Sequence, residues 1–299
     1  MATRTVDGRD DELRRTLLFG LADLWDALLR GPAPKVGIFV AVVALELVLA
    51  STLKTRVLGS RRCRVEPAAV AAEGFPPYVP RDVCEALRRP PGIAARSIAD
   101  PALESDVRRA YESHPWVRRV TRVRRLYPSR VGVDMELRRP FALVEAAAWR
   151  LVVDAEGVVL EDRSSRAPEG LPVVRADART APRIPHLGRA FTAPAVVDGL
   201  AVLRDLDRRR EHPFLRAHPV VAVDVTHAGP ADAAELVLVL RQGAAVDWGV
   251  AASDPLAVLE PAVDRKLDAL GDVEAAYPGL RGVTRINVVS STPYVRSGS

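Results

Sequence analysis

Hydrophobic positions follow three different spacings along the chain. Between Leu17 and Leu29, apolar residues recur at steps of three and four, which predicts an amphipathic helix. Residues 36–53 are instead mostly apolar and contain one charge, Glu46. A helix over this run covers roughly 27 Å, close to the hydrocarbon thickness of a bilayer. We expect one uncleaved transmembrane helix at residues 35–54. A buried core helix is the alternative, and the charge of Glu46 favours it.

From residue 80 onward the pattern is that of a small folded domain. One short helix is indicated around Val83 and Leu87, and a second over residues 103–113 is stopped by a proline. Residues 131–137 alternate between apolar and polar positions, and residues 117–126 are rich in β-forming residues, so the two predict a β-hairpin. We expect a domain over residues 80–145, preceded by a linker at 55–79.

The rest of the chain reads as a mixed β domain with helices over residues 146–290. A second hairpin is indicated at residues 151–160, where Asp154 and Gly157 have the right chemistry for its turn. Pro261 falls inside the last expected helix and would kink it or delay its start. The fold class is therefore α+β, with terminal tails at 1–34 and 291–299. The further elements expected are strands at 171–174, 220–225, 236–240, 244–248 and 283–289, and helices at 195–210 and 255–270.

The positive charge comes almost entirely from arginine. The chain has 43 Lys and Arg against 38 Asp and Glu, a net charge of +5, and its arginines are interleaved with carboxylates. The densest group of arginines lies on the first hairpin, and Trp116, which directly precedes the hairpin, is counted with the same candidate surface. A solvated outer face, a surface for a partner or anionic lipid, and a nucleic-acid surface all remain open, although the arginine face of the strand carries no aromatic residue to stack bases. The residues of this candidate surface are Trp116, Arg118, Arg119, Arg122, Arg124, Arg125 and Arg130.

Catalytic motifs are absent from the sequence. There is no glycine-rich phosphate loop, no nucleophile elbow and no pair of histidines at zinc-protease spacing. A metal site formed by His212, His218 and Asp224 is conceivable, but capping or exposed histidines are the simpler interpretation. Cys63 and Cys84 could form a disulfide or remain free thiols, and the sequence leaves both open. The residues therefore mark out no catalytic site and no cofactor site, and a hydrolase stays open at this point.

The order and spacing of several motifs resemble the FtsQ-type POTRA domain and the β domain that follows it in the FtsQ/DivIB cell-division family. The resemblance covers residues 36–290. Trp248 and the final strand depart from the family pattern. The motifs that carry the resemblance are His114-Pro115-Trp116-Val117, Glu136-Leu137-Arg138-Arg139-Pro140, the hairpin at 151–159, the hairpin at 236–249 and Lys266-Leu267.

This resemblance implies a bitopic protein of the bacterial inner membrane, with a cytoplasmic N-terminus and extracytoplasmic domains. Basic residues are denser after the apolar run than before it, so the positive-inside rule alone gives the opposite orientation. Because long domains translocate largely regardless of charge, we follow the resemblance. It implies a non-enzymatic scaffold that binds division proteins of the FtsB and FtsL type and helps to regulate septal peptidoglycan synthesis.

The partner-binding site implied by the family lies at the end of the β domain. The strand at 283–289 alternates, and at a sheet edge it would offer unpaired backbone groups to a partner strand. It could equally close the sheet with its apolar residues in the core. Rival functions are a POTRA-bearing transport component, an anchored extracytoplasmic enzyme and a cytoplasmic nucleic-acid binder. The candidate partner-binding residues are Ile286, Asn287, Val288, Val289 and Tyr294.

Overall fold

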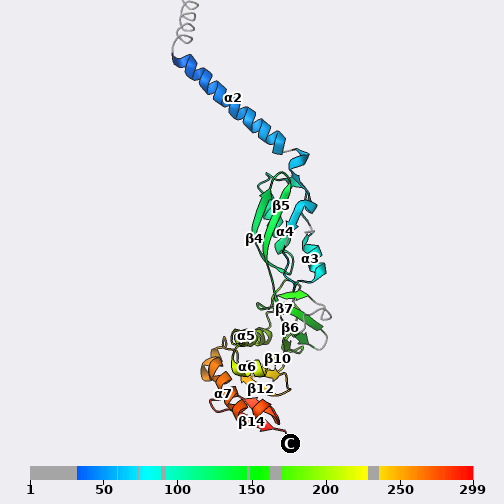
Figure 1. Cartoon of the computed structure of the whole chain (residues 1–299), viewed down its shortest axis with the longest axis vertical. Helices are drawn as coiled ribbons and strands as arrows, with labels where there is room; N and C mark the ends of the chain where they lie inside the picture. Colours follow the sequence, from blue (N-terminus) through cyan, green and yellow to red (C-terminus); the bar gives the residue numbers. More distant parts are fainter. Residues whose placement is uncertain are drawn as a thin grey trace, which may run out of the picture. The chain divides into compact units, whose positions relative to one another are not determined.

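The computed structural model describes residues 32–58, 60–72, 74–88, 92–146, 149–161, 170–227 and 236–298. The helix expected at Leu17–Leu29 lies outside these residues. The chain divides into two compact units. The first comprises residues 1–64 with two short segments, 97–99 and 127–129, and the second holds everything else. Figure 1 shows the elements of both.

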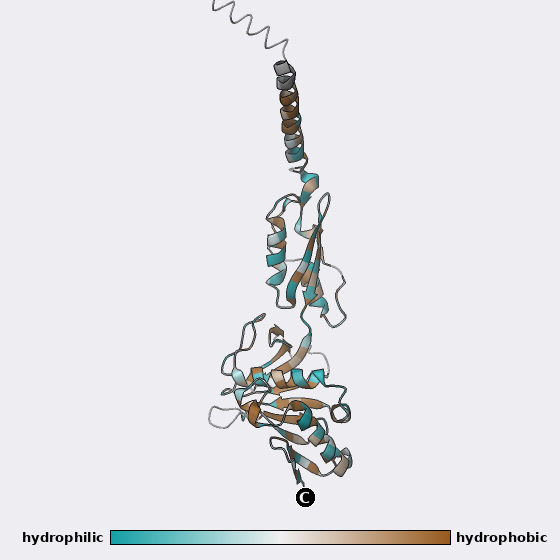
Figure 2. Cartoon of the chain, turned by 90° about the vertical axis from the view of Figure 1, so that its left-hand side faces the viewer, coloured by the Kyte–Doolittle hydropathy of each residue, from teal (hydrophilic) through white to brown (hydrophobic). Residues whose placement is uncertain are grey.

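The first unit is dominated by one helix, α2 (Pro32–Leu58). Two prolines lie in its first turn, where a helix tolerates them. Its large apolar side chains are exposed, among them Phe39 and Leu47 at 68% and 66%. Figure 2 shows these apolar residues gathered in one stretch of α2, with polar residues nearer its C-terminal end. Within the part of the chain that the structure describes, no helix reaches the combined length and hydropathy needed to cross a membrane.

The second unit begins with a three-stranded sheet. Its order is β2 (Val70–Ala72), β5 (Arg130–Leu137) and β4 (Val117–Leu126), with β2 parallel and β4 antiparallel to β5. The predicted hairpin is confirmed, as are the two helices, α3 (Arg81–Arg88) and α4 (Leu103–Glu112). The buried face of α4 carries Leu103, Val107 and Tyr111.

The linker expected at 55–79 contains more structure than its prolines suggested. It holds the 3-10 helices η1 (Arg61–Cys63) and η2 (Pro67–Ala69), the short strand β1 (Arg64–Val65) and β2. Val65 and Val70 are each only 1% exposed. This segment is therefore part of the folded structure. Between α3 and α4, the described residues contain the short strand β3 (Arg96–Ser97).

A nine-stranded mixed sheet forms the rest of the second unit. Its order is β14-β13-β12-β11-β10-β9-β6-β7-β8. The hairpin predicted at 151–160 is confirmed as β7 and β8. The strand bounds are β6 (Pro140–Ala146), β7 (Trp149–Asp154), β8 (Val159–Glu161), β9 (Val173–Arg175), β10 (Val220–Asp224), β11 (Leu236–Leu240), β12 (Ala245–Gly249), β13 (Val283–Asn287) and β14 (Tyr294–Ser297).

Helices cover one face of this sheet and close its main core. They are α5 (Pro194–Arg208), α6 (Pro213–Ala217) and α7 (Val263–Ala276). Helix α5 packs on β9 and β10 through a glycine. A Cβ at Gly199 would lie 2.9 Å from Cγ1 of Val225 and 3.1 Å from Cγ1 of Val174. Only glycine therefore lets the helix approach the sheet this closely.

Three expectations differ from the structure in this region. The chain passes from the three-stranded sheet to the nine-stranded sheet between Leu137 and Pro140. β6 therefore belongs to the nine-stranded sheet, whereas residues up to 145 were expected in the first domain. The helix expected at 255–270 is a 3-10 turn, η4 (Pro255–Leu259), followed by α7, because Pro261 delays its start. The expected C-terminal tail contains the strand β14, and the 3-10 turn η5 (Pro278–Leu280) precedes β13.

Candidate docking surfaces

Trp116 lies at the junction of the two sheets of the second unit. It is only 3% exposed and packs in an apolar cluster with Val79 from before α3. The other members come from β6, β7 and the end of the 151–160 hairpin: Leu143, Val152 and Leu160. Trp116 was expected as part of the POTRA motif and of a possible docking surface. The structure instead makes it a core residue that fixes the smaller sheet to the larger one.

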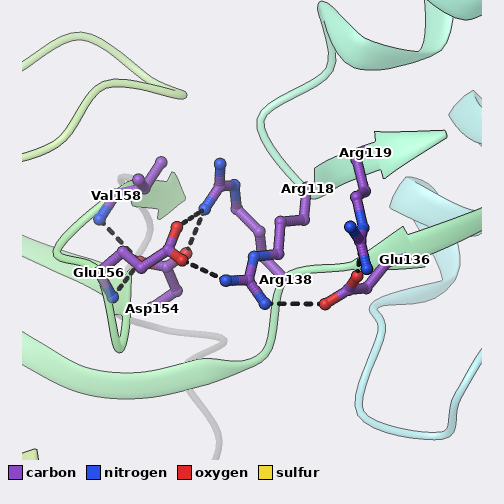
Figure 3. Close-up of polar contacts among 7 residues, drawn as sticks. All are labelled: Arg118, Arg119, Glu136, Arg138, Asp154, Glu156 and Val158. Atoms are coloured by element: carbon purple, nitrogen blue, oxygen red, sulfur yellow. Dashed lines mark hydrogen bonds and ion pairs between the residues drawn. The ribbon is translucent and has the colours of Figure 1, made fainter. Parts of the chain in front are cut away.

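A chain of ion pairs joins the first hairpin to the turn of the second hairpin (Figure 3). Arg138, in the connector between β5 and β6, lies 2.6 Å from Asp154 and 2.9 Å from Glu156, both at the turn of the second hairpin. Arg118 on β4 pairs with Glu156 and, at 2.8 Å, with Glu136 on β5. Five residues from β4, β5, the connector and the second hairpin thus form one continuous network.

Asp154 is the buried centre of this network. One of its carboxylate oxygens, Oδ1, accepts the backbone N–H groups of Glu156 and Val158, at 2.9 and 2.8 Å. The other, Oδ2, accepts from Arg138, whose own backbone N–H donates to the carbonyl of Trp116 at 2.8 Å. The carboxylate therefore holds the hairpin turn and the inter-sheet connector at the same time.

The outer carboxylates of the network are held in their ionised form. The hydrogen bond from Arg138 lowers the pKa of Glu156, and Arg118 adds to this effect. The hydrogen bonds from Arg118 and Arg119 lower the pKa of Glu136. A nearby opposite charge stabilises the charged form of each group. The lowered pKa values favour the charged forms of Glu156 and Glu136, on which their ion pairs with arginine depend.

The arginine-rich strand β4 is largely neutralised by its own neighbours. Arg119 pairs with Glu136 at 2.7 Å and Arg124 with Asp134 at 2.8 Å. Arg125 donates to the carbonyl of Asp100 at 3.1 Å. Arg122 is exposed and has no ion-pair partner among the described residues. Most of the expected basic surface is thus engaged within the fold, which favours the interpretation of a solvated outer face.

Of the two positions left open for the strand at 283–289, a sheet edge or a closing strand inside the sheet, the structure shows the second. β13 lies between β12, with which it is parallel, and β14, with which it is antiparallel. Ile286 and Val288 are 0% and 1% exposed, so they close the sheet from inside its core. Asn287 and Val289 are half-buried, and the side-chain oxygen of Asn287 accepts the N–H of Val289 at 3.1 Å.

Tyr294 is the one candidate partner-binding residue that the structure leaves open to solvent. It is 67% exposed, begins β14 and pairs with Asn287 across the ladder. The residues after it, Val295 to Ser297, complete the strand. The sequence did not indicate them, because this strand is short, mostly exposed and without an apolar alternation.

The two edge strands of the nine-stranded sheet, β8 and β14, differ in what lies beside them. Outside β8, the segment around Gly188 forms backbone hydrogen bonds with Val159, and Val158 bridges to Ala190. β14 has a neighbouring strand on one side only among the described residues. A strand with a free side presents unpaired N–H and C=O groups. Among the described residues, no strand lies beside the outer side of β14.

A cavity and an exposed apolar turn lie beside the segment that leads into β14. The cavity has a volume of about 650 Å³ and lies between the N-terminal part of α7 and residues 288–291, which lead to β14. Lys266, itself 3% exposed, donates to the carbonyl of Trp248 and to Glu260, both at 2.6 Å. This anchors η4, on which Val258 is 85% exposed.

The remaining candidate sites do not form. Cys63 and Cys84 are free cysteines, and Cys84 donates to the carbonyl of Val79 at 3.8 Å. His212 caps α6, whereas His218 contacts Glu274 and Gln242 at 2.5 and 2.7 Å. Asp224 accepts from Thr226 instead. Nowhere in the described ranges do three metal-ligating side chains converge.

Comparison with known proteins gives one relative of named function. The chain is 32% identical over 130 residues to a protein of Streptomyces bingchenggensis (strain BCW-1) named "Cell division protein FtsQ". The match covers 44% of this chain and 46% of the relative, so it spans just under half of the relative's length. No family model matches the chain.

Proposed function

We propose that this protein is a non-enzymatic scaffold of the bacterial cell-division machinery. The observation that carries the proposal is the combination of a partial match to a protein named for cell division and a large sheet that ends in an open strand. A scaffold of this kind binds other division proteins and helps to regulate septal peptidoglycan synthesis. Its partners are proteins of the FtsB and FtsL type.

The docking site in this proposal is the β14 edge, defined by residues 294–297. A partner segment adds a strand there, since main-chain hydrogen bonds supply affinity and neighbouring pockets supply specificity. The cavity beside residues 288–291 and the exposed side chain of Val258 extend the surface available to the same partner. Tyr294 contributes an exposed aromatic ring, a residue type enriched at interface hot spots.

We further propose that the apolar run at residues 35–54 anchors the chain in the inner membrane, with the folded domains extracytoplasmic. The support is the nearly uncharged sequence of 36–53 and the exposure of apolar side chains on α2, such as Phe39 and Leu45. In this arrangement residues 55–79 lead from the membrane surface into the POTRA-type domain, and residues 140–298 form the partner-binding β domain.

The experiment that tests the proposal combines a topology reporter with crosslinking. The full chain is expressed in a bacterium with a C-terminal reporter that is active only outside the cytoplasm, and bound proteins are recovered after crosslinking. We expect an active reporter and small single-span division proteins in the eluate. An inactive reporter would place the C-terminal domains in the cytoplasm and contradict the proposal.

A further inference from the structure

A second cavity lies away from the β14 edge, among residues that the proposed docking does not use. It has a volume of about 660 Å³. It lies where three parallel strands begin: β6 at Pro140, β9 after Pro172 and β10 after Pro219. The C-terminal half of α5 forms another wall.

The floor of this cavity is apolar. Six large apolar side chains from five separate segments line it: Phe141, Leu171, Leu203, Leu206, Leu215 and Val220. The prolines that precede or open the three strands have no N–H to donate. The carbonyls of Pro172 and Pro219 already accept backbone hydrogen bonds from Leu143 and Arg241. The floor therefore offers contacts to an apolar side chain but few hydrogen bonds to a small polar ligand.

The rim of the cavity is strongly basic. Four arginines line it, against one aspartate, Asp207. Arg208 and Arg210 pair with Asp205 and Glu211, at 2.9 and 3.6 Å. The other two, Arg139 and Arg204, have no carboxylate partner among the residues that the structure describes.

Unpaired guanidinium groups above an apolar floor define the kind of ligand that fits. Arginine binds carboxylates through two parallel hydrogen bonds, and it is enriched at protein interfaces. The arginines come from the β5–β6 connector, α5 and the turn after α5, so they can meet several carboxylates along a chain. A cavity of this volume accommodates one large side chain from such a chain.

We propose that this cavity, bounded by Arg139 and Arg204, binds an acidic peptide segment of a partner protein. The segment inserts one large apolar side chain between Phe141 and Leu203, and its flanking Asp or Glu residues pair with the rim arginines. This site is separate from the β14 edge and would allow two partners to bind at once.

The test is a titration of the purified full chain with a fluorescein-labelled synthetic peptide in which glutamates flank a central phenylalanine. Binding is followed by fluorescence anisotropy. We expect Arg204→Glu and Arg139→Glu each to weaken binding by about tenfold or more, because each reverses a charge at the rim. Arg183→Glu is the matched control, since Arg183 is exposed and lies outside the cavity.

Two further measurements separate the proposal from simple charge attraction. Ala155→Trp places a ring at the cavity wall without changing its charge, and a peptide with serine in place of phenylalanine removes the inserted group. Both changes should weaken binding by about tenfold. If neither does, the interaction is non-specific and the proposal is wrong.

Two further tests distinguish peptide binding in the cavity from lipid binding and from docking at the β14 edge. Co-sedimentation with vesicles containing anionic lipid should be unaffected by Arg204→Glu. If vesicle binding falls while peptide binding does not, the cavity faces a membrane and the proposal fails. Val295→Pro disrupts β14 without touching the cavity and should leave peptide binding unchanged. Recovery of crosslinked division proteins by Val295→Pro tests the proposed function separately, because that function requires β14 and not the cavity.

Discussion

The guanidinium of Arg138 lies 2.6 Å from the carboxylate of Asp154, and the two side chains are only 15% and 7% exposed. This pair joins the connector between the two sheets to the turn of the second hairpin, beside the buried ring of Trp116. The geometry of the junction is therefore fixed by one buried charge pair and one apolar cluster. The small sheet and the large sheet are held as parts of one compact unit.

Removing one partner of this pair should be costly. In Asp154→Ala, Arg138 loses its buried counter-charge, and the N–H groups of Glu156 and Val158 lose their acceptor. We expect the free energy of unfolding to fall by about 3 kcal/mol. Urea unfolding followed by tryptophan fluorescence measures it.

A matched exposed pair supplies the control. Arg109→Ala removes one of the two arginine partners of Asp106, where Arg109 is 80% exposed, and exposed pairs contribute less than about 1 kcal/mol. If Asp154→Ala costs no more than Arg109→Ala, Asp154 does not hold the junction.

Stability should decrease in acid through the outer carboxylates. Arginine partners hold the pKa of Glu156 and Glu136 below the ordinary value of 4.5 in the folded chain. The unfolded chain therefore binds more protons in this range, and stability is lost as the pH falls from about 4.5 through the folded-state pKa values. We expect Glu156→Gln to show a shallower decrease in this window. The unfolding free energy is measured with urea between pH 5 and pH 3, about the range in which carboxylates titrate. If its slope against pH is the same in Glu156→Gln as in the unsubstituted chain, this contribution is excluded.

The close packing of α5 on the sheet is tested by Gly199→Ala. The added Cβ meets Val225 at 2.9 Å and Val174 at 3.1 Å, so the helix must shift. Overpacking of this kind costs about 1–3 kcal/mol. Gly271→Ala in α7 is the control, because no atom lies within 4 Å of its added Cβ and alanine favours a helix by about 0.5–1 kcal/mol. Opposite signs of the two stability changes are expected, and a loss in both variants would contradict the explanation.

Tyr111 carries a buried hydroxyl without a hydrogen-bond partner among the described residues. Burial also raises its pKa to about 12. Tyr111→Phe removes the unsatisfied group and keeps the ring, so we expect stability to rise by about 1 kcal/mol. The absorbance step at the highest pH of an alkaline titration should disappear in this variant. A loss of stability would show that the hydroxyl makes a contact that matters.

The sequence was informative where one face of an element is buried. The alternation at 131–137 and the helical spacing at 195–210 predicted β5 and α5, because burial imposes a period on apolar residues. β14 escaped prediction for the opposite reason. Its residues are mostly exposed and polar, as edge strands commonly are, so no period marks them.

The candidate sites were harder to predict because they depend on which segments meet. The arginines of β4 form a dense group in the sequence, yet their partners Glu136, Glu156 and Asp134 come from other strands and turns. Ile286 was correctly placed on a strand, but only the sheet order shows that β13 is covered by β14. Periodicity gives the buried face of a strand and not its neighbours.

Site-specific photo-crosslinking tests the docking edge most directly. A photoreactive phenylalanine analogue replaces Tyr294, which is 67% exposed on β14, and in a control it replaces Tyr127, which is 65% exposed between β4 and β5. In dividing cells, we expect the probe at residue 294 to form adducts with small single-span division proteins and the probe at 127 to form far fewer. Adducts of equal yield at both positions, or none at 294, would contradict docking at the β14 edge.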